Sequence, residues 1–383
     1  MTGQQFEDIE AFAAAGLATL EAKGIRRSLL PAARNADGVT RNHRRLISFC
    51  DNDYLGLSQH SAVIRASIEA TREFGAGAGA ARLVTGDNPL NQKLETRLAQ
   101  VKGLPAARVF GSGYLANIGV IPVLASPGDL IAIDELSHAC MFSGAKLSGA
   151  EVAVFPHNDV AALARLLANR APGFKALVLT ETVFSMDGDL APLDEIQTAC
   201  RTHRAWLMTD DAHGLGVLKR TNPAPIQMGT LSKAAGAYGG YIAGPSKLIE
   251  LITSRARSFV YTTGLPPGVL AAALAALDVM EAAPELGARA VTNARLFASL
   301  IGRDPASVDS AIVPVILGDS AKALEASERL EAEGFLVTAI RPPTVPAGTA
   351  RLRVTFSARH QEQDVRRLAD LVRALLPAQA AAE

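Results

Sequence analysis

The segment Gly229-Thr-Leu-Ser-Lys-Ala234 separates the apolar run Pro225-Ile-Gln-Met228 from a following run built mostly of Gly, Ala and Tyr. Similar apolar runs alternate with helix-like segments from about residue 102 to residue 244. This alternation predicts an α/β fold whose sheet is mostly parallel and covered by helices. The expected strands are 107–110, 130–134, 151–155, 176–180, 205–209, 225–228 and 241–243, with helices between several of them, such as 160–170 and 192–203.

The remainder of the chain has a different order of elements. Pro284 interrupts the apolar helical pattern that begins near Gly268, because proline cannot continue a helix. The expected order after it is helix, strand 311–317, helix 321–333, strands 337–340 and 350–356, and helix 361–376. We therefore predict an N-terminal segment (1–44), a large domain (45–283) and a smaller C-terminal α+β domain (284–383), a split that suits a chain of 383 residues.

Polar residues gather where the expected strands end. Asp210 and His213 follow one strand and Lys233 follows the next, and ligands of parallel sheets collect at that edge. A lysine amine can form a Schiff base with a carbonyl, and a carboxylate can keep a pyridine nitrogen protonated. Together these residues suggest pyridoxal phosphate as the cofactor, although a lysine in a polar turn can also be a solvated cation.

Two glycine-rich segments have separate interpretations. Residues 74–86 precede a clear helix (88–102) and predict either a close-approach loop or a flexible connector. Residues 111–116 follow a strand and open a helix, whose backbone N–H groups can hold a phosphate. They also fit a dinucleotide fingerprint, with Asp134 about 20 residues further on in the place of the ribose acid. That alternative, a nicotinamide enzyme, gives no role to Lys233.

Four further side chains have a functional and a plain interpretation each. His138, after a strand end, either packs as an ordinary histidine or lays its ring on a flat cofactor. Ser185 lies in a turn with two carboxylates and either serves that turn or contacts a cofactor hydroxyl. Arg351 and Arg353 share one strand face after a proline-rich loop, and either remain solvated or bind a carboxylate.

Composition limits the partners. Lys plus Arg and Asp plus Glu both number 38, so no net field favours nucleic acid or an anionic membrane surface. Residues 1–10 lack the basic flank and apolar core of a signal peptide, and the most apolar helical stretch contains Asp278 and Glu281. We expect a cytoplasmic protein without a metal site, since the three cysteines are widely spaced and suit packing.

Several motifs resemble those of the α-oxoamine synthases, which are fold-type I pyridoxal-phosphate enzymes that condense an amino acid with an acyl thioester. The resemblance extends from about residue 25 to residue 376. The motifs are Phe49-Cys-Asp-Asn-Asp-Tyr-Leu-Gly-Leu57, Gly79-Ala-Ala-Arg-Leu-Val-Thr-Gly86, Leu136-Ser-His-Ala139, Phe184-Ser-Met-Asp-Gly188, Asp210-Asp-Ala-His-Gly214 and Thr230-Leu-Ser-Lys233. One departure is the short connection 219–225, where the family usually has a longer glycine-rich segment.

The resemblance implies a role for each matching residue. Lys233 would bond to the cofactor and move protons, Asp210 would pair with the pyridine nitrogen, and His213 would contact the ring hydroxyl. The other implied cofactor contacts are His138 on the ring face, Ser185 beside the ring, and Gly113, Tyr114 and Thr230 around the phosphate. The implied substrate contacts are Arg26, Asn52, Thr344 and Arg353, with Arg353 as the partner of the amino-acid carboxylate.

The resemblance also implies partners. Residues 341–353 are most similar to the family member of biotin biosynthesis, which joins L-alanine to a pimeloyl thioester of coenzyme A or a carrier protein. Siblings that use glycine or serine, such as glycine C-acetyltransferase or a 5-aminolevulinate-synthase-like enzyme, remain an alternative. A homodimer with shared active sites is implied, in which Tyr261-Thr-Thr263 would reach the phosphate of the neighbouring subunit.

Overall fold

The computed structural model describes residues 8–35 and 38–376, and the chain divides into two compact units, residues 1–47 and 48–383. The first unit contains a helix and a small antiparallel meander, whose second hairpin turns at Asn42 and His43. Both of these residues have positive φ (49° and 60°), which suits the tight turn of a two-residue hairpin. Its elements are α1 (Ile9–Ala22), β1 (Ala33–Asn35), β2 (Gly38–Arg41) and β3 (Arg44–Ser48).

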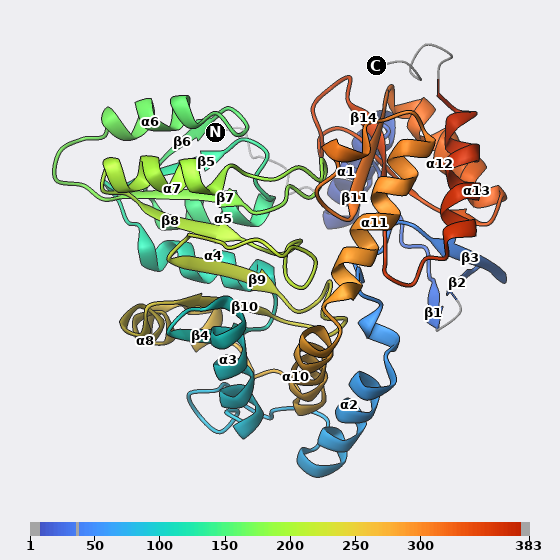
Figure 1. Cartoon of the computed structure of the whole chain (residues 1–383). Helices are drawn as coiled ribbons and strands as arrows, with labels where there is room; N and C mark the ends of the chain where they lie inside the picture. Colours follow the sequence, from blue (N-terminus) through green and yellow to red (C-terminus); the bar gives the residue numbers. More distant parts are fainter. Residues whose placement is uncertain (1–7, 36–37, 377–383) are drawn as a thin grey trace. The chain divides into compact units, whose positions relative to one another are not determined.

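The second unit is built on a seven-stranded sheet with the order β4-β10-β9-β8-β7-β5-β6 (Figure 1). Its strands are β4 (Ala106–Phe110), β5 (Leu130–Asp134), β6 (Glu151–Phe155), β7 (Ala176–Glu181), β8 (Trp206–Asp210), β9 (Ile226–Thr230) and β10 (Gly240–Gly244). Strands β6, β5, β7, β8 and β9 pair in parallel, and β10 is antiparallel to both of its neighbours. The predicted mostly parallel sheet is therefore confirmed.

Helices cover both faces of this sheet, because alternate side chains of its central strands point to opposite faces. Ile131 and Ile133 belong to a buried cluster that includes α4 (Gly113–Leu124), α5 (Ala139–Ser148) and α8 (Ser246–Arg255). Leu130 and Ala132 belong to a second cluster that includes α6 (Val160–Ala168) and α7 (Leu193–Thr202). Beside β4 and β10, the core instead uses α3 (Pro89–Lys102) and α10 (Pro267–Ala282). The helix α2 (Ser61–Phe74) packs along α10.

The C-terminal part has the predicted α+β order. A three-stranded antiparallel sheet, β11-β14-β13, lies with helices α11 (Glu285–Leu300), α12 (Ser320–Ala332) and α13 (Glu362–Arg373). Its strands are β11 (Ile312–Gly318), β13 (Thr338–Ile340) and β14 (Ala350–Thr355). The expected strand 337–340 is preceded by a separate short strand, β12 (Phe335–Leu336), because the Leu336 carbonyl accepts from Phe49 N whereas Thr338–Ile340 pair with β14.

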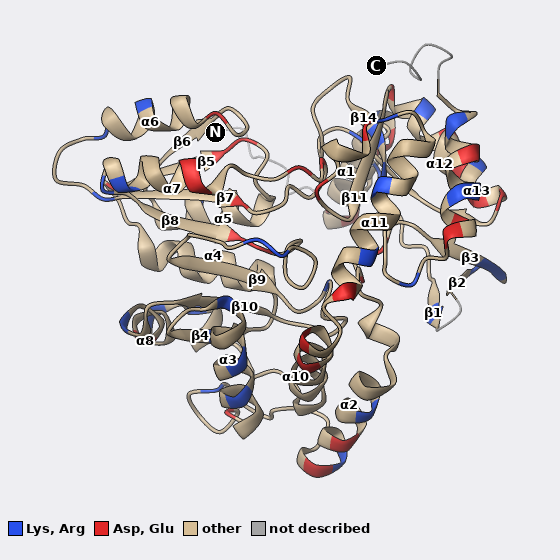
Figure 2. Cartoon of the chain, in the orientation of Figure 1, with Lys and Arg blue, Asp and Glu red and all other residues tan. Residues whose placement is uncertain are grey.

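The predicted break at Pro284 is confirmed, since α10 ends at Ala282 and α11 begins at Glu285. The domain boundary placed there stays a prediction. Figure 2 shows acidic and basic residues interspersed on α2, α12 and α13. Among residues 8–35 and 38–376, no helix has the length and apolar character that crossing a bilayer requires, and no group of metal-ligating side chains is found.

Candidate active site

Four strands of the sheet end with polar residues at the same edge. These residues are Asp134 on β5, Glu181 on β7, Asp210 on β8 and Thr230 on β9. Glu181 and Asp210 are directly paired in the parallel ladder, so their carboxylates are neighbours. Both are buried, and burial together with the negative charge of Asp210 raises the pKa of Glu181 well above its usual value.

Lys233 follows this edge in a tight turn and meets His213. The Lys233 Nζ atom lies 2.7 Å from His213 Nε2. Burial lowers the pKa of Lys233, an effect that the negative charges of Asp210 and Glu181 oppose. Burial, together with the positive charge of Lys233, also lowers the pKa of His213 well below its usual value. A neutral imidazole next to an amine with a lowered pKa favours a lysine that can act as a nucleophile and base.

The shape of the lysine turn depends on Gly236. This residue has φ of 60°, and a Cβ atom there would lie 2.1 Å from the backbone nitrogen of Ser58. The turn therefore needs glycine both for its left-handed conformation and for the close approach of residues 57–58. This approach brings residues 49–57, the motif that contains Asn52, next to the turn of Lys233.

Asp210 is held in place by two donors. Asn117 Nδ2 and the Ala212 backbone N–H each donate to one of its carboxylate oxygens, at 2.9 Å. Burial raises the pKa of Asp210, while the charge of Lys233 and the bond from Asn117 oppose that rise. Its neighbour Asp211 is paired instead with Lys102, at 2.6 Å. Of the two adjacent aspartates, only Asp210 belongs to the cluster around Lys233.

His138 presents its ring at the start of α5. Its backbone N–H donates to Glu181 at 2.6 Å, and its Nδ1 lies 2.9 Å from the thiol of Cys140. The same thiol accepts from Asn117, so Cys140 is a hydrogen-bonding member of the site as well as a packing residue. Burial raises the pKa of Cys140 to about 12, so the thiol keeps its proton and can donate it to His138. His138 itself is exposed, which leaves its ring free to stack.

Tyr54, a residue that the sequence analysis did not single out, connects His213 with the predicted substrate residues. Its hydroxyl lies 2.6 Å from His213 Nδ1 and donates to Asn52 Oδ1 at 3.0 Å. Because the Tyr54 hydroxyl donates its only proton to Asn52, His213 donates from Nδ1 to the Tyr54 oxygen, and Nε2 accepts from Lys233. Arg353 also donates to Asn52 Oδ1, at 3.2 Å. One directed chain therefore joins Lys233 to Arg353.

The two arginines of β14 are both buried, so the interpretation that they remain solvated is wrong. Arg353 Nε donates to the Ser185 carbonyl. Arg351 forms an ion pair with Asp187 and donates to the Met186 carbonyl. The strand alternation that the sequence predicted thus directs both guanidinium groups to the turn that contains Ser185.

Three predicted phosphate contacts converge at the start of α4. Ser112 caps this helix by accepting from Leu115 N, and Gly113 and Tyr114 begin it. A Cβ atom on Gly240 would lie 2.4 Å from Gly113 N, and one on Gly113 would lie 3.4 Å from the Thr230 side chain. Glycine at position 240 therefore lets β10 and the helix start lie close together, whereas the distance from Gly113 to Thr230 is an ordinary contact. The N–H groups of the helix start suit a dianion, whereas the Thr230 hydroxyl donates to the Gly239 carbonyl at 2.8 Å.

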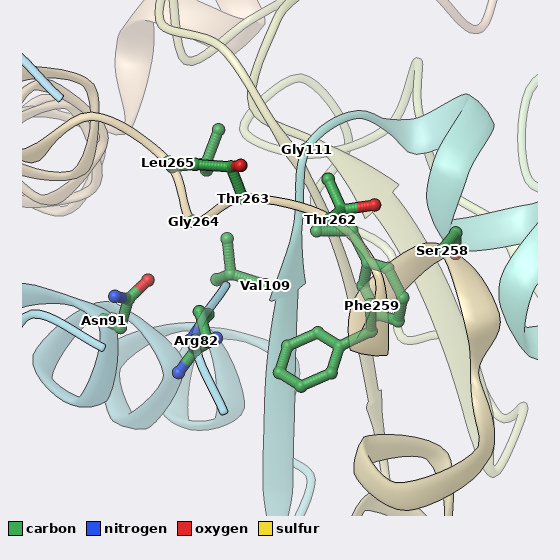
Figure 3. Close-up of a pocket in the computed structure, with 11 residues that line it drawn as sticks. Arg82, Asn91, Val109, Gly111, Ser258, Phe259, Thr262, Thr263, Gly264 and Leu265 are labelled. Carbon is green, nitrogen blue, oxygen red and sulfur yellow. The ribbon is translucent and has the colours of Figure 1, made fainter. Parts of the chain in front are cut away.

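The predicted partner-subunit segment lies beside the same helix start. Thr262 and Thr263 line a pocket together with Gly111, Phe259 and Arg82 (Figure 3). Ser258, also in this lining, donates to the Leu115 carbonyl at 2.6 Å. Tyr261 is exposed. The role of residues 261–263 toward a neighbouring subunit stays a prediction.

Two predicted substrate residues are not brought into the cluster by any contact among the described residues. Thr344 is exposed, and its N–H donates to the Arg341 carbonyl at 3.0 Å. Arg26 belongs to the first unit, where it pairs with Glu21 at 2.6 Å. Both residues stay predictions. Glu181 was expected at the ligand-binding strand ends and binds the His138 N–H, whereas Asn117, which donates to Asp210, was not expected from the sequence. Tyr54 and Asn52 share one quoted motif, and that proximity was the available clue.

The nicotinamide alternative conflicts with the position of Asp134. This carboxylate is fully buried, and its oxygens accept from the backbone N–H groups of Leu136 and Asn158 at 2.9 Å each. A ribose acid has to face the ligand, and Asp134 instead fixes the loop that carries His138. The fingerprint match in residues 111–116 is therefore explained by the helix start alone.

Residues 44–372 match the family model described as aminotransferase class I and II. Among solved structures, the chain is similar to serine palmitoyltransferase from S. paucimobilis with a bound PLP–myriocin aldimine. The two are 28% identical, the match covers 96% of this chain and 98% of that structure, and the TM-score is 0.89. It is also similar to the structure of 8-amino-7-oxononanoate synthase from Francisella tularensis. The two are 25% identical, the match covers 86% of this chain and 97% of that structure, and the TM-score is 0.73. The chain belongs to the aminotransferase class I and II family.

Curated relatives narrow that assignment. The chain is 55% identical to 8-amino-7-oxononanoate synthase of Methylobacterium radiotolerans over 96% of its length and 99% of the relative. It is 54% identical to a putative 8-amino-7-oxononanoate synthase of Caulobacter vibrioides, over 95% of its length and 97% of the relative. Within the family, the chain therefore belongs with the 8-amino-7-oxononanoate synthases, which confirms the resemblance drawn from the motifs.

Proposed function

We propose that the protein catalyses the condensation of L-alanine with a pimeloyl thioester, with loss of carbon dioxide and free thiol, to give 8-amino-7-oxononanoate. The observation that supports this most strongly is the group of Lys233 with the buried His213 and Asp210, joined through Tyr54 to Arg353. An amine, an imidazole, a carboxylate and a guanidinium are the groups that a pyridoxal-phosphate enzyme needs for an amino-acid substrate. The relatives named above support the choice of product.

The described residues fit pyridoxal phosphate. The helix start at Gly113, with Thr230 close by, offers donors for the phosphate, and Asp210 offers a buried carboxylate for the pyridine nitrogen. Lys233 Nζ offers the amine that bonds to the aldehyde carbon, and the exposed ring of His138 offers a stacking surface. When bound, this cofactor supplies an electron sink for charge that develops on the α-carbon of the amino acid.

Each residue then has a defined task. Lys233, whose pKa burial lowers, takes the α-proton of the amino acid and returns a proton after decarboxylation. Asp210 keeps a proton on the ring nitrogen by its negative charge, which its bond from Asn117 helps to maintain. Arg353, fixed by the Ser185 carbonyl and Asn52, binds the carboxylate of L-alanine. These contacts hold the α-carbon near Lys233.

We propose further that the protein is a homodimer whose sites are completed by residues 261–263 of the second copy. The dimer is a property implied by the family. The support from the structure is that Tyr261 is exposed, so its side chain is available to a second copy. Gel filtration combined with light scattering would test this proposal. A monomer at assay concentration that is fully active would contradict it.

The activity is tested by incubating the protein and pyridoxal phosphate with L-alanine, glycine or L-serine, each with pimeloyl-coenzyme A, a pimeloyl carrier protein, or acetyl- and palmitoyl-coenzyme A. We expect 8-amino-7-oxononanoate, identified by mass spectrometry, to form only from L-alanine with a pimeloyl donor, together with stoichiometric carbon dioxide and thiol. Preferred turnover of glycine or serine would indicate a sibling activity. Absence of any product would contradict the proposal.

The role of Arg353 is tested separately by Arg353→Lys, which keeps the charge but loses the planar fork. We expect KM for L-alanine to rise by about tenfold or more, corresponding to roughly 1.4 kcal/mol, with unchanged cofactor affinity. Arg366→Lys on α13 is a matched control, because Arg366 is an exposed residue paired with Glu362. If both variants keep the same KM, Arg353 does not bind the carboxylate.

A further inference from the structure

His157 follows β6 and lies outside the contacts described for the proposed active site, yet both of its ring nitrogens face a carboxylate. Nδ1 is 3.0 Å from Asp134 Oδ1, and Nε2 is 2.7 Å from Asp189 Oδ2. An ionised carboxylate only accepts hydrogen bonds, so both nitrogens must carry protons and the ring is an imidazolium. Burial alone would lower the pKa of His157, but the bonds and charges of the two aspartates raise it to about 10.

The first carboxylate connects His157 to the loop that contains His138. Asp134 is fully buried, and in addition to His157 it accepts from the backbone N–H groups of Leu136 and Asn158. Leu136 is two residues before His138, whose own N–H is bound by Glu181. The position of Asp134 therefore sets the path of the chain from β5 to the start of α5.

The second carboxylate connects His157 to the turn that contains Ser185. Asp189 also accepts from Asn158 Nδ2 at 3.1 Å, and its backbone carbonyl accepts from Phe184 N at 3.0 Å. The Phe184 ring packs edge-on against the His157 ring, with centroids 4.3 Å apart. The Met186 and Ser185 carbonyls of the same turn accept from Arg351 and Arg353 of β14.

We propose that His157 is a positioning residue, an imidazolium bridge that fixes loop 134–139 against turn 184–190. The bridge sets the positions of His138 and Ser185 relative to the cofactor. Through the Ser185 carbonyl, it also sets the position of Arg353 relative to the amino acid. This inference rests on the proposed function for the identity of the two ligands. The bridge itself follows from the contacts of His157 with Asp134 and Asp189.

A charged bridge suits this place for a physical reason. Two carboxylates face each other across the ring, and Asp134 is fully buried, so an uncharged spacer would leave this carboxylate without a cationic partner and with only its two backbone N–H donors. A planar ring with donors on opposite sides also spans the two loops without the flexibility of a lysine. Replacement by glutamine keeps one donor and loses both the charge and the second bond.

The test uses His157→Gln, with Asp189→Asn as a milder change of the same contact. His203→Gln is the control, because His203 ends α7 and no side-chain hydrogen bond of it is found among the described residues. Hydrogen exchange of the apoprotein, read by mass spectrometry, reports on peptides from 134–139 and 184–190. We expect both peptides to exchange about tenfold faster in His157→Gln, while the β11–β14 pair and the control stay as in the wild type.

Kinetics of the holoenzyme then separate positioning from simple structural support. We expect KM for L-alanine to rise by about tenfold with a smaller change in kcat, and with a melting temperature close to the wild type for Asp189→Asn. If His157→Gln does not fold, Asp189→Asn provides both measurements. Unchanged exchange, faster exchange in one loop only, or faster exchange with an unchanged KM would each overturn the proposal.

These outcomes are distinct from failure of the proposed function. If the wild-type protein forms no product from any amino acid and thioester, the reaction assigned above is wrong. Hydrogen exchange needs no cofactor or substrate and still decides whether His157 couples the two loops. Exchange that is faster in both loops supports the bridge, and exchange that is faster in neither rejects it.

Discussion

Replacing Tyr54 with phenylalanine removes one buried hydroxyl from the chain of hydrogen bonds between Lys233 and Arg353. The hydroxyl makes bonds of 2.6 Å to His213 and 3.0 Å to Asn52, and a long contact of 3.4 Å from Arg353. In Tyr54→Phe, Asn52 keeps its donor Arg353, but the Nδ1 proton of His213 loses its acceptor. A buried donor without a partner costs about 1–3 kcal/mol.

That cost predicts the kinetic result. Relief of the unpaired proton requires His213 to move it to Nε2, the nitrogen that faces Lys233, which disturbs the amine. We expect kcat/KM for L-alanine to fall by about 30-fold, the equivalent of roughly 2 kcal/mol. The assay is steady-state product formation with saturating cofactor, accompanied by a melting curve to confirm folding.

Tyr241→Phe is the matched control. Tyr241 is also fully buried, but its hydroxyl has no hydrogen-bond partner among the described residues, so its removal breaks no bond. We expect this variant to keep wild-type kinetics and at least wild-type stability. Equal kinetic losses in the two variants, or wild-type kinetics in Tyr54→Phe, would show that the Tyr54 hydroxyl does not position His213.

Three further changes have defined outcomes. Asp210→Asn removes the buried charge near Lys233, and we expect the activation barrier of turnover to rise by about 3 to 4 kcal/mol, which lowers kcat. Steady-state turnover within threefold of wild type would contradict this. Lys233→Ala should abolish turnover but retain the cofactor non-covalently on gel filtration. Near-normal turnover would contradict the assignment of Lys233 as the catalytic lysine. Burial lowers the pKa of His360 from 6.5 to about 4. The unfolded chain therefore binds the proton first, and stability present above pH 6.5 is lost as the pH falls toward 4, by up to about 3 kcal/mol. Urea unfolding of wild type and His360→Phe at pH 7 and pH 5 measures this, and equal losses in both proteins would speak against His360.

The positions of strands and helices along the chain were largely predictable from the sequence, because the central strands are buried on both faces and form short continuous apolar runs. The run 130–134 is one example, since every residue of β5 is buried. The split between β12 and β13 could not be predicted. It depends on a change of hydrogen-bond partner at Val337, from Phe49 to β14, and partners distant in the chain leave no local pattern.

The residues of the site were predictable in part for the same reason. Lys233, Asp210 and His213 stand at strand ends, and parallel topology brings strand ends together. Tyr54 and Arg353 meet at 3.4 Å although almost 300 positions separate them, and only tertiary packing brings them together. The partner of Asp134 could not be predicted either, because the sequence does not show whether a carboxylate at a strand end faces a ligand or a histidine.

The proposed function depends above all on a covalent bond between Lys233 and pyridoxal phosphate. Borohydride reduction of the holoenzyme, followed by proteolysis and peptide mass spectrometry, identifies the modified lysine directly. We expect a single reduced adduct, on the peptide that contains Lys233, and no adduct when L-alanine has displaced the lysine before reduction. An adduct on another lysine, such as Lys102, or no adduct after incubation with pyridoxal phosphate, would contradict the assignment.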